Sequence, residues 1–167
     1  MRTYRRTAMS RRMIGAGVLV LGGALATMSP GPSDSATVAE LHVYKSPTCG
    51  CCSKWVDHIR AAGFVVTVED VDGLGPVKER LGVPPRLASC HTAVVGDYIV
   101  EGHVPAEVIA KFLREAPTVR GIAVPGMPIG SPGMEGPRPQ PYEVIAFDGN
   151  GNHTVYETMD PGQRNPG

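Results

Sequence analysis

Acidic residues are absent from the first 26 positions of the 167-residue chain, although five of its 16 basic residues lie there. The remaining 11 basic and all 16 acidic residues lie in positions 27–167, which therefore carry a net charge of −5. This charge disfavours a nucleic-acid partner, because phosphates are bound by clusters of Lys and Arg. The sequence also lacks internal repeats and a basic amphipathic helix that could insert stably in a membrane surface. Residues 27–167 are enough for one hydrophobic core and too few for two ordinary domains.

The first 26 residues have the organisation of an export signal. Arginines precede Ile14–Ala26, an apolar run of 13 residues that is too short to span a bilayer. The run ends in a small-x-small cleavage pattern at residues 24–26. Arg11-Arg12 resembles a twin-arginine signal, and the general secretory route fits equally well. An uncleaved anchor is the alternative. We predict an export signal over residues 1–26, a flexible leader over 27–39 and a mature chain outside the bacterial cytoplasm.

Strand and helix patterns alternate from residue 40 onward. In chain order, we expect a strand at 41–45, a helix at about 50–62 with Thr48 as its N-cap, a strand at 64–69, a helix at 75–81 ended by Pro84-Pro85, a hairpin at 92–100 that turns at Gly96-Asp97, and a helix between Pro105 and Pro117. The order β-α-β-α-β-β-α predicts an α/β, thioredoxin-like fold with a mixed sheet over residues 40–116.

Proline and glycine are frequent between residues 117 and 160. Apolar side chains, including Met127 and Met134, interrupt this composition, whereas a plain linker would be more polar. We interpret the segment as an ordered Met-containing loop followed by a β-hairpin over residues 142–156, both packed on the thioredoxin-like domain. Residues 161–167 are expected to form a frayed tail.

Three of the four cysteines lie together in Cys49-Gly50-Cys51-Cys52. The outer pair is a C-x-x-C motif at a predicted helix N-terminus, where N–H groups and the helix dipole lower a thiol pKa from about 8.5 to about 3.5–7.5. Such a thiolate is both a nucleophile in disulfide exchange and a soft metal ligand. Cys51 favours a metal, because a third thiol would offer a dithiol catalyst a competing disulfide.

The fourth cysteine, Cys90, directly precedes a predicted strand. Thioredoxin-like proteins that act on disulfides usually carry a cis-proline at this position, facing the C-x-x-C helix. Here sulfur is followed by the imidazole of His91, and His103 precedes the third helix. With the thioethers of Met127 and Met134, these groups form a soft ligand set that suits Cu(I), and histidine also tolerates Cu(II).

Each of these residues has a structural alternative. The four cysteines of an exported protein can form two structural disulfides, although a single Cys49–Cys52 disulfide in the resting oxidised protein is compatible with a metal site. His91 can be a polar residue at a strand end, and the imidazole of His103 can bind backbone. Methionines in a Gly/Pro-rich loop often cover a hydrophobic surface.

Four segments carry a resemblance to a known family. They are Val43-Tyr44-Lys45-Ser46-Pro47-Thr48-Cys49-Gly50-Cys51-Cys52, Ser89-Cys90-His91-Thr92-Ala93, Glu101-Gly102-His103-Val104-Pro105-Ala106 and Val124-Pro125-Gly126-Met127-Pro128-Ile129-Gly130-Ser131-Pro132-Gly133-Met134-Glu135. Together they resemble the CopG-type copper-resistance family over about residues 40–157. The resemblance implies a periplasmic, thioredoxin-like protein that binds copper through its cysteines, as single ions or as a cluster, and helps to interconvert Cu(I) and Cu(II) during detoxification.

We therefore predict a periplasmic copper-binding protein that is also a candidate copper oxidoreductase. The predicted metal ligands are Cys49, Cys51, Cys52, Cys90, His91, His103, Met127 and Met134. Cys49 and Cys52 are also the predicted redox pair. Copper ions are the expected partners, together with other periplasmic copper-handling or efflux proteins.

Three alternatives remain open at this point. The first is a thiol-disulfide oxidoreductase of the glutaredoxin or arsenate-reductase type, in which Cys49 attacks and Cys52 resolves. The second is a redox-passive copper carrier. The third is a zinc site formed by the four cysteines, which would leave the two methionines without a role.

Overall fold

The computed structural model describes residues 39–162, so the predicted export signal, most of the leader and the last five residues of the tail lie outside the described part. The elements in this part are β1 (Glu40–Lys45), α1 (Gly50–Ala61), β2 (Val65–Asp70), α2 (Gly75–Leu81), the 3-10 helix η1 (Pro85–Leu87), β3 (His91–Val95), β4 (Tyr98–Glu101), α3 (Ala106–Glu115), β5 (Gly121–Ala123), β6 (Tyr142–Phe147) and β7 (His153–Met159). No helix in this range is long and apolar enough to cross a membrane.

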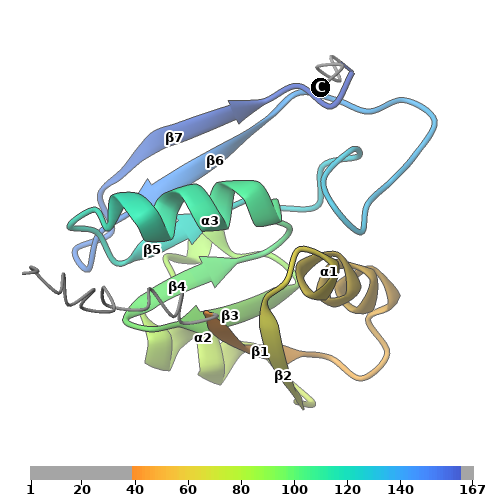
Figure 1. Ribbon diagram of the computed structural model, residues 1–167. Coiled ribbons are helices and arrows are strands. Elements are labelled where there is room, and N and C mark those ends of the chain that lie inside the picture. Colours follow the sequence, from red (N-terminus) through yellow and green to blue (C-terminus); the bar gives the residue numbers. More distant parts are fainter. Residues whose placement is uncertain (1–38, 163–167) are drawn as a thin grey trace, which may run out of the picture. The chain divides into compact units, whose positions relative to one another are not determined.

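One mixed sheet contains all seven strands in the order β2-β1-β3-β4-β5-β6-β7 (Figure 1). β1 pairs in parallel with β2 and antiparallel with β3, and β3 continues into the β3–β4 hairpin. The β5 strand then pairs in parallel with β4 and antiparallel with β6. This topology brings the end of β1, which leads to the first cysteines, beside the start of β3, which follows Cys90.

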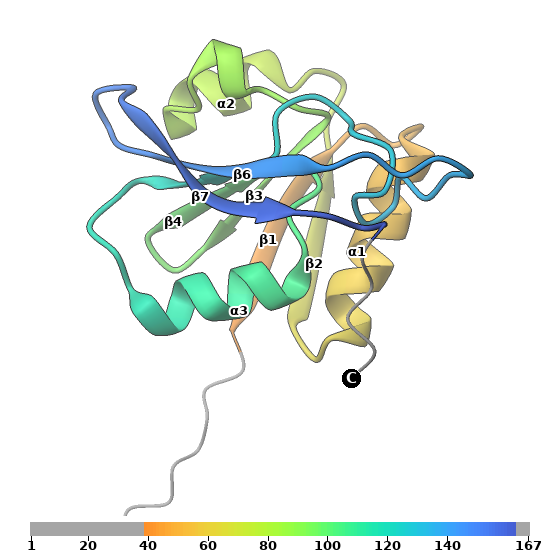
Figure 2. The ribbon, with the colours of Figure 1, turned by 90° about the horizontal axis from the view of Figure 1, so that it is seen from above.

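The helices cover both faces of the sheet (Figure 2), with α2 on one side and α1 and α3 on the other. Alternation along the strands supplies a hydrophobic surface to each face. In β4, Val100 packs in the cluster that contains Trp55 of α1 and Phe112 of α3. Its neighbour Ile99 packs in a second cluster with Val83, after α2. Strands buried on both faces are expected where helices cover a sheet on two sides.

The element order confirms the predicted α/β, thioredoxin-like fold, and three details differ from the predictions. Thr48 is not the N-cap of α1, because the chain stays extended through Cys49, whose sulfur accepts a hydrogen bond from the backbone N–H of Cys52. Gly82, rather than the prolines that follow it, ends α2, since its left-handed conformation (φ 76°) closes the helix.

The third difference is β5, which lies within the segment predicted to be a loop. Its three residues are too few to show a periodic pattern, and their extended conformation is imposed by pairing with β4 and β6. Gly121 allows this close approach, because a Cβ atom there would lie 2.1 Å from the carbonyl oxygen of Ile99. The C-terminal hairpin therefore continues the sheet, and its second strand extends to Met159 rather than ending at residue 156.

Candidate metal and thiol site

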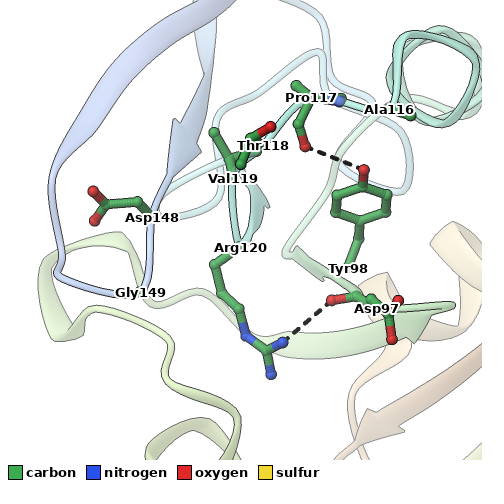
Figure 3. A pocket seen from close by; sticks show the side chains of 9 residues that line it. All are labelled: Asp97, Tyr98, Ala116, Pro117, Thr118, Val119, Arg120, Asp148 and Gly149. Carbon is green, nitrogen blue, oxygen red and sulfur yellow. Dashed lines mark hydrogen bonds between the residues drawn. The ribbon is translucent and has the colours of Figure 1, made fainter.

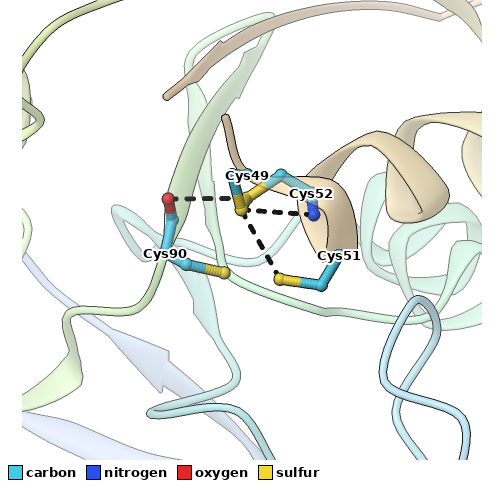
Figure 4. A group of neighbouring side chains, drawn as sticks. All are labelled: Cys49, Cys51, Cys52 and Cys90. Carbon is cyan, nitrogen blue, oxygen red and sulfur yellow. Dashed lines mark hydrogen bonds between the residues drawn. A yellow bond between two sulfur atoms is a disulfide. The ribbon is translucent and has the colours of Figure 1, made fainter. Parts of the chain in front are cut away.

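The N-terminus of α1 holds three sulfur atoms. Cys49 is the N-cap, and its sulfur lies 3.4 Å from the backbone nitrogen of Cys52. Cys49 and Cys52 form a disulfide across one helical turn. The Cys51 sulfur lies 3.5 Å from the Cys49 sulfur and belongs to a free thiol (Figure 4). Cys52 is fully buried, whereas Cys49 and Cys51 are partly exposed.

Cys90 completes the sulfur cluster from the other side of the site. It precedes β3, and its sulfur belongs with those of Cys49, Cys51 and Cys52 to a group of ligand atoms that all lie within 4.8 Å of one another. Its backbone carbonyl lies 3.7 Å from the Cys52 sulfur (Figure 4). Burial, together with the neighbouring Cys51 sulfur, raises the pKa of Cys90 to about 12. Without metal, Cys90 is therefore a neutral thiol, and a bound metal must displace its proton.

His103 faces Cys90 from the segment between β4 and α3. Its Nε2 atom lies 2.9 Å from the Cys90 sulfur, and its Nδ1 atom lies 2.8 Å from the carbonyl oxygen of Pro132. A carbonyl oxygen only accepts, so Nδ1 carries the proton and Nε2 presents a lone pair to the sulfur. Burial lowers the pKa of His103 and outweighs the opposing hydrogen bond to Pro132. The imidazole is thus held in the neutral tautomer that binds metal through Nε2.

His91 is also fully buried at the start of β3. Its ring centroid lies 4.3 Å from that of Trp55 and 4.9 Å from that of His103. Ligand atoms of His91, His103 and Cys90 lie within 4.8 Å of one another. Burial, followed by the charges of His103 and Lys78, lowers the pKa of His91 well below 6.5. Within residues 39–162, its Nε2 is the one buried side-chain nitrogen or oxygen atom without a hydrogen-bond partner.

The predicted Met-containing loop passes beside the site. Gly133, with φ +85°, packs so closely that a Cβ atom there would lie 2.6 Å from the Cys51 carbonyl oxygen and 3.3 Å from the His103 Nδ1 atom. The carboxylate of Glu135 accepts a hydrogen bond from the Gly133 N–H at 2.7 Å, which holds this turn. Met134 is half-buried next to Gly133, whereas the Met127 side chain is 53% exposed. Both methionines remain predicted ligands.

The structure thus brings six of the eight predicted ligands into two groups that share Cys90. Two contributions to this site were absent from the sequence-based prediction. The Pro132 carbonyl has no side-chain signature, so no sequence pattern identifies it as the partner of His103. Gly133 was recognised only as part of the resembling segment, and its close approach to α1 depends on the fold.

A separate hollow of about 490 Å³ lies at the opposite ends of β3 and β4. It is bordered by the β3–β4 turn, the segment after α3 and the β6–β7 turn (Figure 3). The Arg120 guanidinium binds the backbone carbonyls of Leu81 and Asp97 there, and the Tyr98 hydroxyl binds that of Pro117. None of the predicted site residues lines this hollow.

The fold and the site define a thioredoxin-like protein with a sulfur- and imidazole-rich centre at the N-terminus of α1. A family model described as a protein of unknown function, DUF411, matches residues 87–134. Two solved structures, both named copper resistance protein CopG, are 45% identical to the chain. Form 2 covers 73% of this chain and 98% of its own, with a TM-score of 0.69. Form 1 covers 72% and 96%, with a TM-score of 0.68.

The chain therefore belongs to the CopG-type copper-resistance family, as the resemblance of its four segments implied. No curated protein matches the chain. Its membership of this family, together with the cysteine cluster, supports copper binding.

Proposed function

We propose that this protein binds copper in the periplasm through Cys49, Cys51, Cys52 and Cys90, with His91 and His103 as nitrogen ligands, and that it interconverts Cu(I) and Cu(II). The observation that carries the proposal is the sharing of Cys90 between a four-sulfur group and a group with two imidazoles, each within 4.8 Å. Thiolates prefer Cu(I), and imidazole accepts both oxidation states. Met127 and Met134 are proposed as thioether ligands from the loop beside the site.

The donor atoms of the site support a metal ligand role. His103 Nε2 carries a lone pair because its Nδ1 atom donates to Pro132. His91 Nε2 is buried without a partner, a state that costs free energy unless another group supplies a bond. A soft metal ion bound at this site would replace the proton of Cys90, whose sulfur lies 3.6 Å from the Nδ1 atom of His91.

The disulfide supplies the redox step of this proposal. The reduced Cys49 and Cys52 thiols give two electrons and two protons when their sulfurs form the S–S bond. These electrons reduce two Cu(II) ions to two Cu(I) ions, and the protons pass to solvent. The Cys49–Cys52 disulfide is the oxidised state that this step would produce. Return to the dithiol requires a two-electron reductant of the thiol class. In the opposite direction, dioxygen would take one electron from each of two Cu(I) ions and two protons from solvent, which gives two Cu(II) ions and hydrogen peroxide.

Copper titration of the reduced protein tests the binding proposal. We expect elemental analysis to find protein-bound copper in the wild type and none above background in Cys51→Ser/Cys90→Ser. Equal copper uptake by the two proteins would overturn the assignment of the site.

Anaerobic addition of Cu(II) to the reduced protein tests the redox proposal. We expect the Cu(II) EPR signal to disappear, with one Cys49–Cys52 disulfide formed for each two ions reduced. Cys49→Ser/Cys52→Ser is the matched control and should retain the signal. A redox-passive carrier would bind copper with its Cu(II) signal intact.

The Cys49–Cys52 disulfide also favours a second function, thiol-disulfide exchange with a protein substrate. Cys49 is partly exposed at a helix N-terminus and Cys52 is buried, the usual arrangement of attacking and resolving thiols. Against this function, Cys90 stands at the position where a cis-proline is usual in disulfide-exchange enzymes of this fold. Metal-free protein should therefore reduce insulin disulfides poorly. Rapid reduction that survives Cys51→Ser would favour the exchange enzyme.

A further inference from the structure

A buried polar cluster lies on the α2 face of the sheet, away from α1. We call it the carboxylate cluster, and it consists of Lys78, Ser89, Thr92 and Glu101. The Glu101 side chain is fully buried. Its carboxylate accepts hydrogen bonds from the Ser89 backbone N–H at 2.5 Å, the Thr92 hydroxyl at 2.7 Å and the Lys78 ammonium at 2.5 Å. None of these four residues was among the predicted ligands.

Two of the groups bound by Glu101 flank a pair of predicted ligands. Ser89 and Thr92 directly precede and follow Cys90 and His91. Successive side chains of a strand point to opposite faces, so Thr92 reaches Glu101 on the α2 face while His91 packs against Trp55 of α1. The carboxylate therefore fixes both ends of a four-residue segment whose middle carries a thiol and an imidazole of the site.

The same carboxylate is linked to His103 through the chain. Gly102 lies between Glu101 and His103, and its N–H donates to the His91 carbonyl oxygen at 3.0 Å. A Cβ atom on Gly102 would lie 2.5 Å from the Ser89 hydroxyl oxygen, which shows how tightly the two segments pack. Displacement of the Ser89 end would thus alter the separation between Cys90 and His103, now 2.9 Å between sulfur and Nε2.

We propose that Glu101 is a positioning residue of this site: as a buried hydrogen-bond acceptor for Ser89 and Thr92, it holds the Cys90 thiol against the His103 imidazole. The proposal rests on the proposed copper site for its effect on metal affinity. Lys78 pairs the carboxylate charge, because a buried charge without a partner is strongly destabilising. It also donates to the Thr92 hydroxyl at 2.9 Å, a bond that both test variants lose equally. The positioning effect depends on an acceptor atom at residue 101, not on its charge.

Two double variants that remove both charges separate these roles. Lys78→Met/Glu101→Gln keeps an amide oxygen for the Ser89 N–H and an amide nitrogen that can donate to Thr92. Lys78→Met/Glu101→Leu keeps the approximate volume and removes the acceptor. Replacement of a buried ion pair by apolar residues of similar size is often tolerated, and circular dichroism with thermal unfolding checks that both variants fold.

Competition titration with a Cu(I) chelator measures affinity, and the thiolate-to-copper absorption bands report the geometry of the site. We expect the Gln variant to stay near the wild-type affinity with the wild-type bands. The Leu variant should lose about 10–100-fold in affinity, the usual effect of removing a group that orients a ligand, with altered bands. A folded Leu variant with wild-type affinity and bands would overturn the proposal, as would an equal loss in the Gln variant.

Amide hydrogen exchange at Ser89 in reduced, metal-free protein tests positioning without copper. Exchange should be slow in the wild type and the Gln variant and faster in the Leu variant. If the Leu variant does not fold, Glu101→Asp with Lys78 retained replaces it, because the charge stays while the acceptor is withdrawn from Ser89. If Ser89 exchanged as slowly in the folded Leu or Asp variant as in the wild type, the result would contradict the proposal. A wild type that binds no copper would instead overturn the copper site, and the exchange result would still decide the role of Glu101.

Discussion

The β3 and β4 strands end in two different polar regions. At the start of β3 and after β4, the ligand atoms of Cys90, His91 and His103 lie within 4.8 Å of one another, and His91 Nε2 has no partner. At the other end, the Arg120 guanidinium donates to the backbone carbonyl of Asp97 at 3.2 Å (Figure 3). It also donates to the backbone carbonyl of Leu81 at 3.4 Å.

This difference separates a chemical site from a structural one. The guanidinium at the Arg120 end is a permanent cation whose donors are bound to the chain itself, so it links the segment after α3 to the β3–β4 turn and to the C-terminal end of α2. The sulfur and nitrogen atoms at the Cys90 end retain lone pairs that a soft metal can use. The hollow of about 490 Å³ lies at the Arg120 end of the strands. The candidate site at the Cys90 end is therefore recognised by its free lone pairs and not by a concave surface.

The largest expected effect comes from Cys90→Ser, which removes the residue shared by the two ligand groups. We expect copper affinity to fall more than about 100-fold, because the loss of a direct ligand exceeds the 10–100-fold usual for an outer-sphere group. Copper competition titration measures the change. Thermal unfolding of metal-free protein should show little loss of stability. If the variant kept the wild-type copper affinity, Cys90 would not be a copper ligand, and the two ends of β3 and β4 would no longer differ in metal binding.

Gly133→Ala should have the next largest effect. A left-handed φ costs a residue with Cβ about 1–2 kcal/mol, and the added atom meets the Cys51 carbonyl at 2.6 Å, which adds about 1–3 kcal/mol of overpacking. We expect the alkylation rate of the Cys51 thiol to rise because the loop must move.

Gly126→Ala is the matched control for this variant. Gly126 has φ +68°, but a Cβ atom there would have no neighbour within 4 Å, so only the conformational cost applies. Urea unfolding should therefore show a clearly smaller loss of stability than in Gly133→Ala. Equal losses would mean that contact with α1 contributes nothing to the position of the loop.

Arg120→Met should act on stability and leave copper binding unchanged. The substitution leaves the carbonyl oxygens of Leu81 and Asp97 without these hydrogen bonds, at a cost of about 1–2 kcal/mol for partly exposed groups. Urea unfolding measures the loss. A fall in copper affinity would show that the two ends of the strands are coupled.

The smallest expected effect is the pH dependence of metal-free stability. Burial lowers the pKa of His91 and His103 in the folded chain, so below the unfolded-state pKa of 6.5 the unfolded chain binds more protons and stability falls. As the pH falls from 6.5 toward 5.5, the free energy of unfolding should therefore decrease. Urea unfolding across this range should give a flatter slope for His91→Gln/His103→Gln. An unchanged slope would contradict the buried neutral imidazoles.

The sequence predicted most of the first seven elements because each has a local cause. Trp55 and Ile59 recur at helical spacing in α1, and Gly96 with its positive φ of 55° allows the tight turn of the β3–β4 hairpin. The β5 strand was missed because its conformation depends on neighbours distant in sequence. Cys49 was missed as the N-cap because sulfur is not among the usual capping acceptors.

The candidate site divides in the same way. Sequence spacing and residue type indicated Cys49, Cys51 and Cys52 on one helical turn, and the predicted order of elements placed Cys90, His91 and His103 at the same end of the sheet. Only the tertiary structure supplied the contacts of His103 with Pro132, of Gly133 with Cys51, and of Glu101 with the Cys90 segment.

The sequence by itself determined an acidic chain after residue 26, a thioredoxin-like order of elements and a local concentration of soft ligands. These properties depend on composition and on neighbours along the chain. The tertiary structure decided which imidazole nitrogen faces Cys90 and which buried carboxylate binds the Cys90 segment. Such properties depend on distances between atoms that the chain separates by many residues, and they become defined only when the sheet and its helices pack.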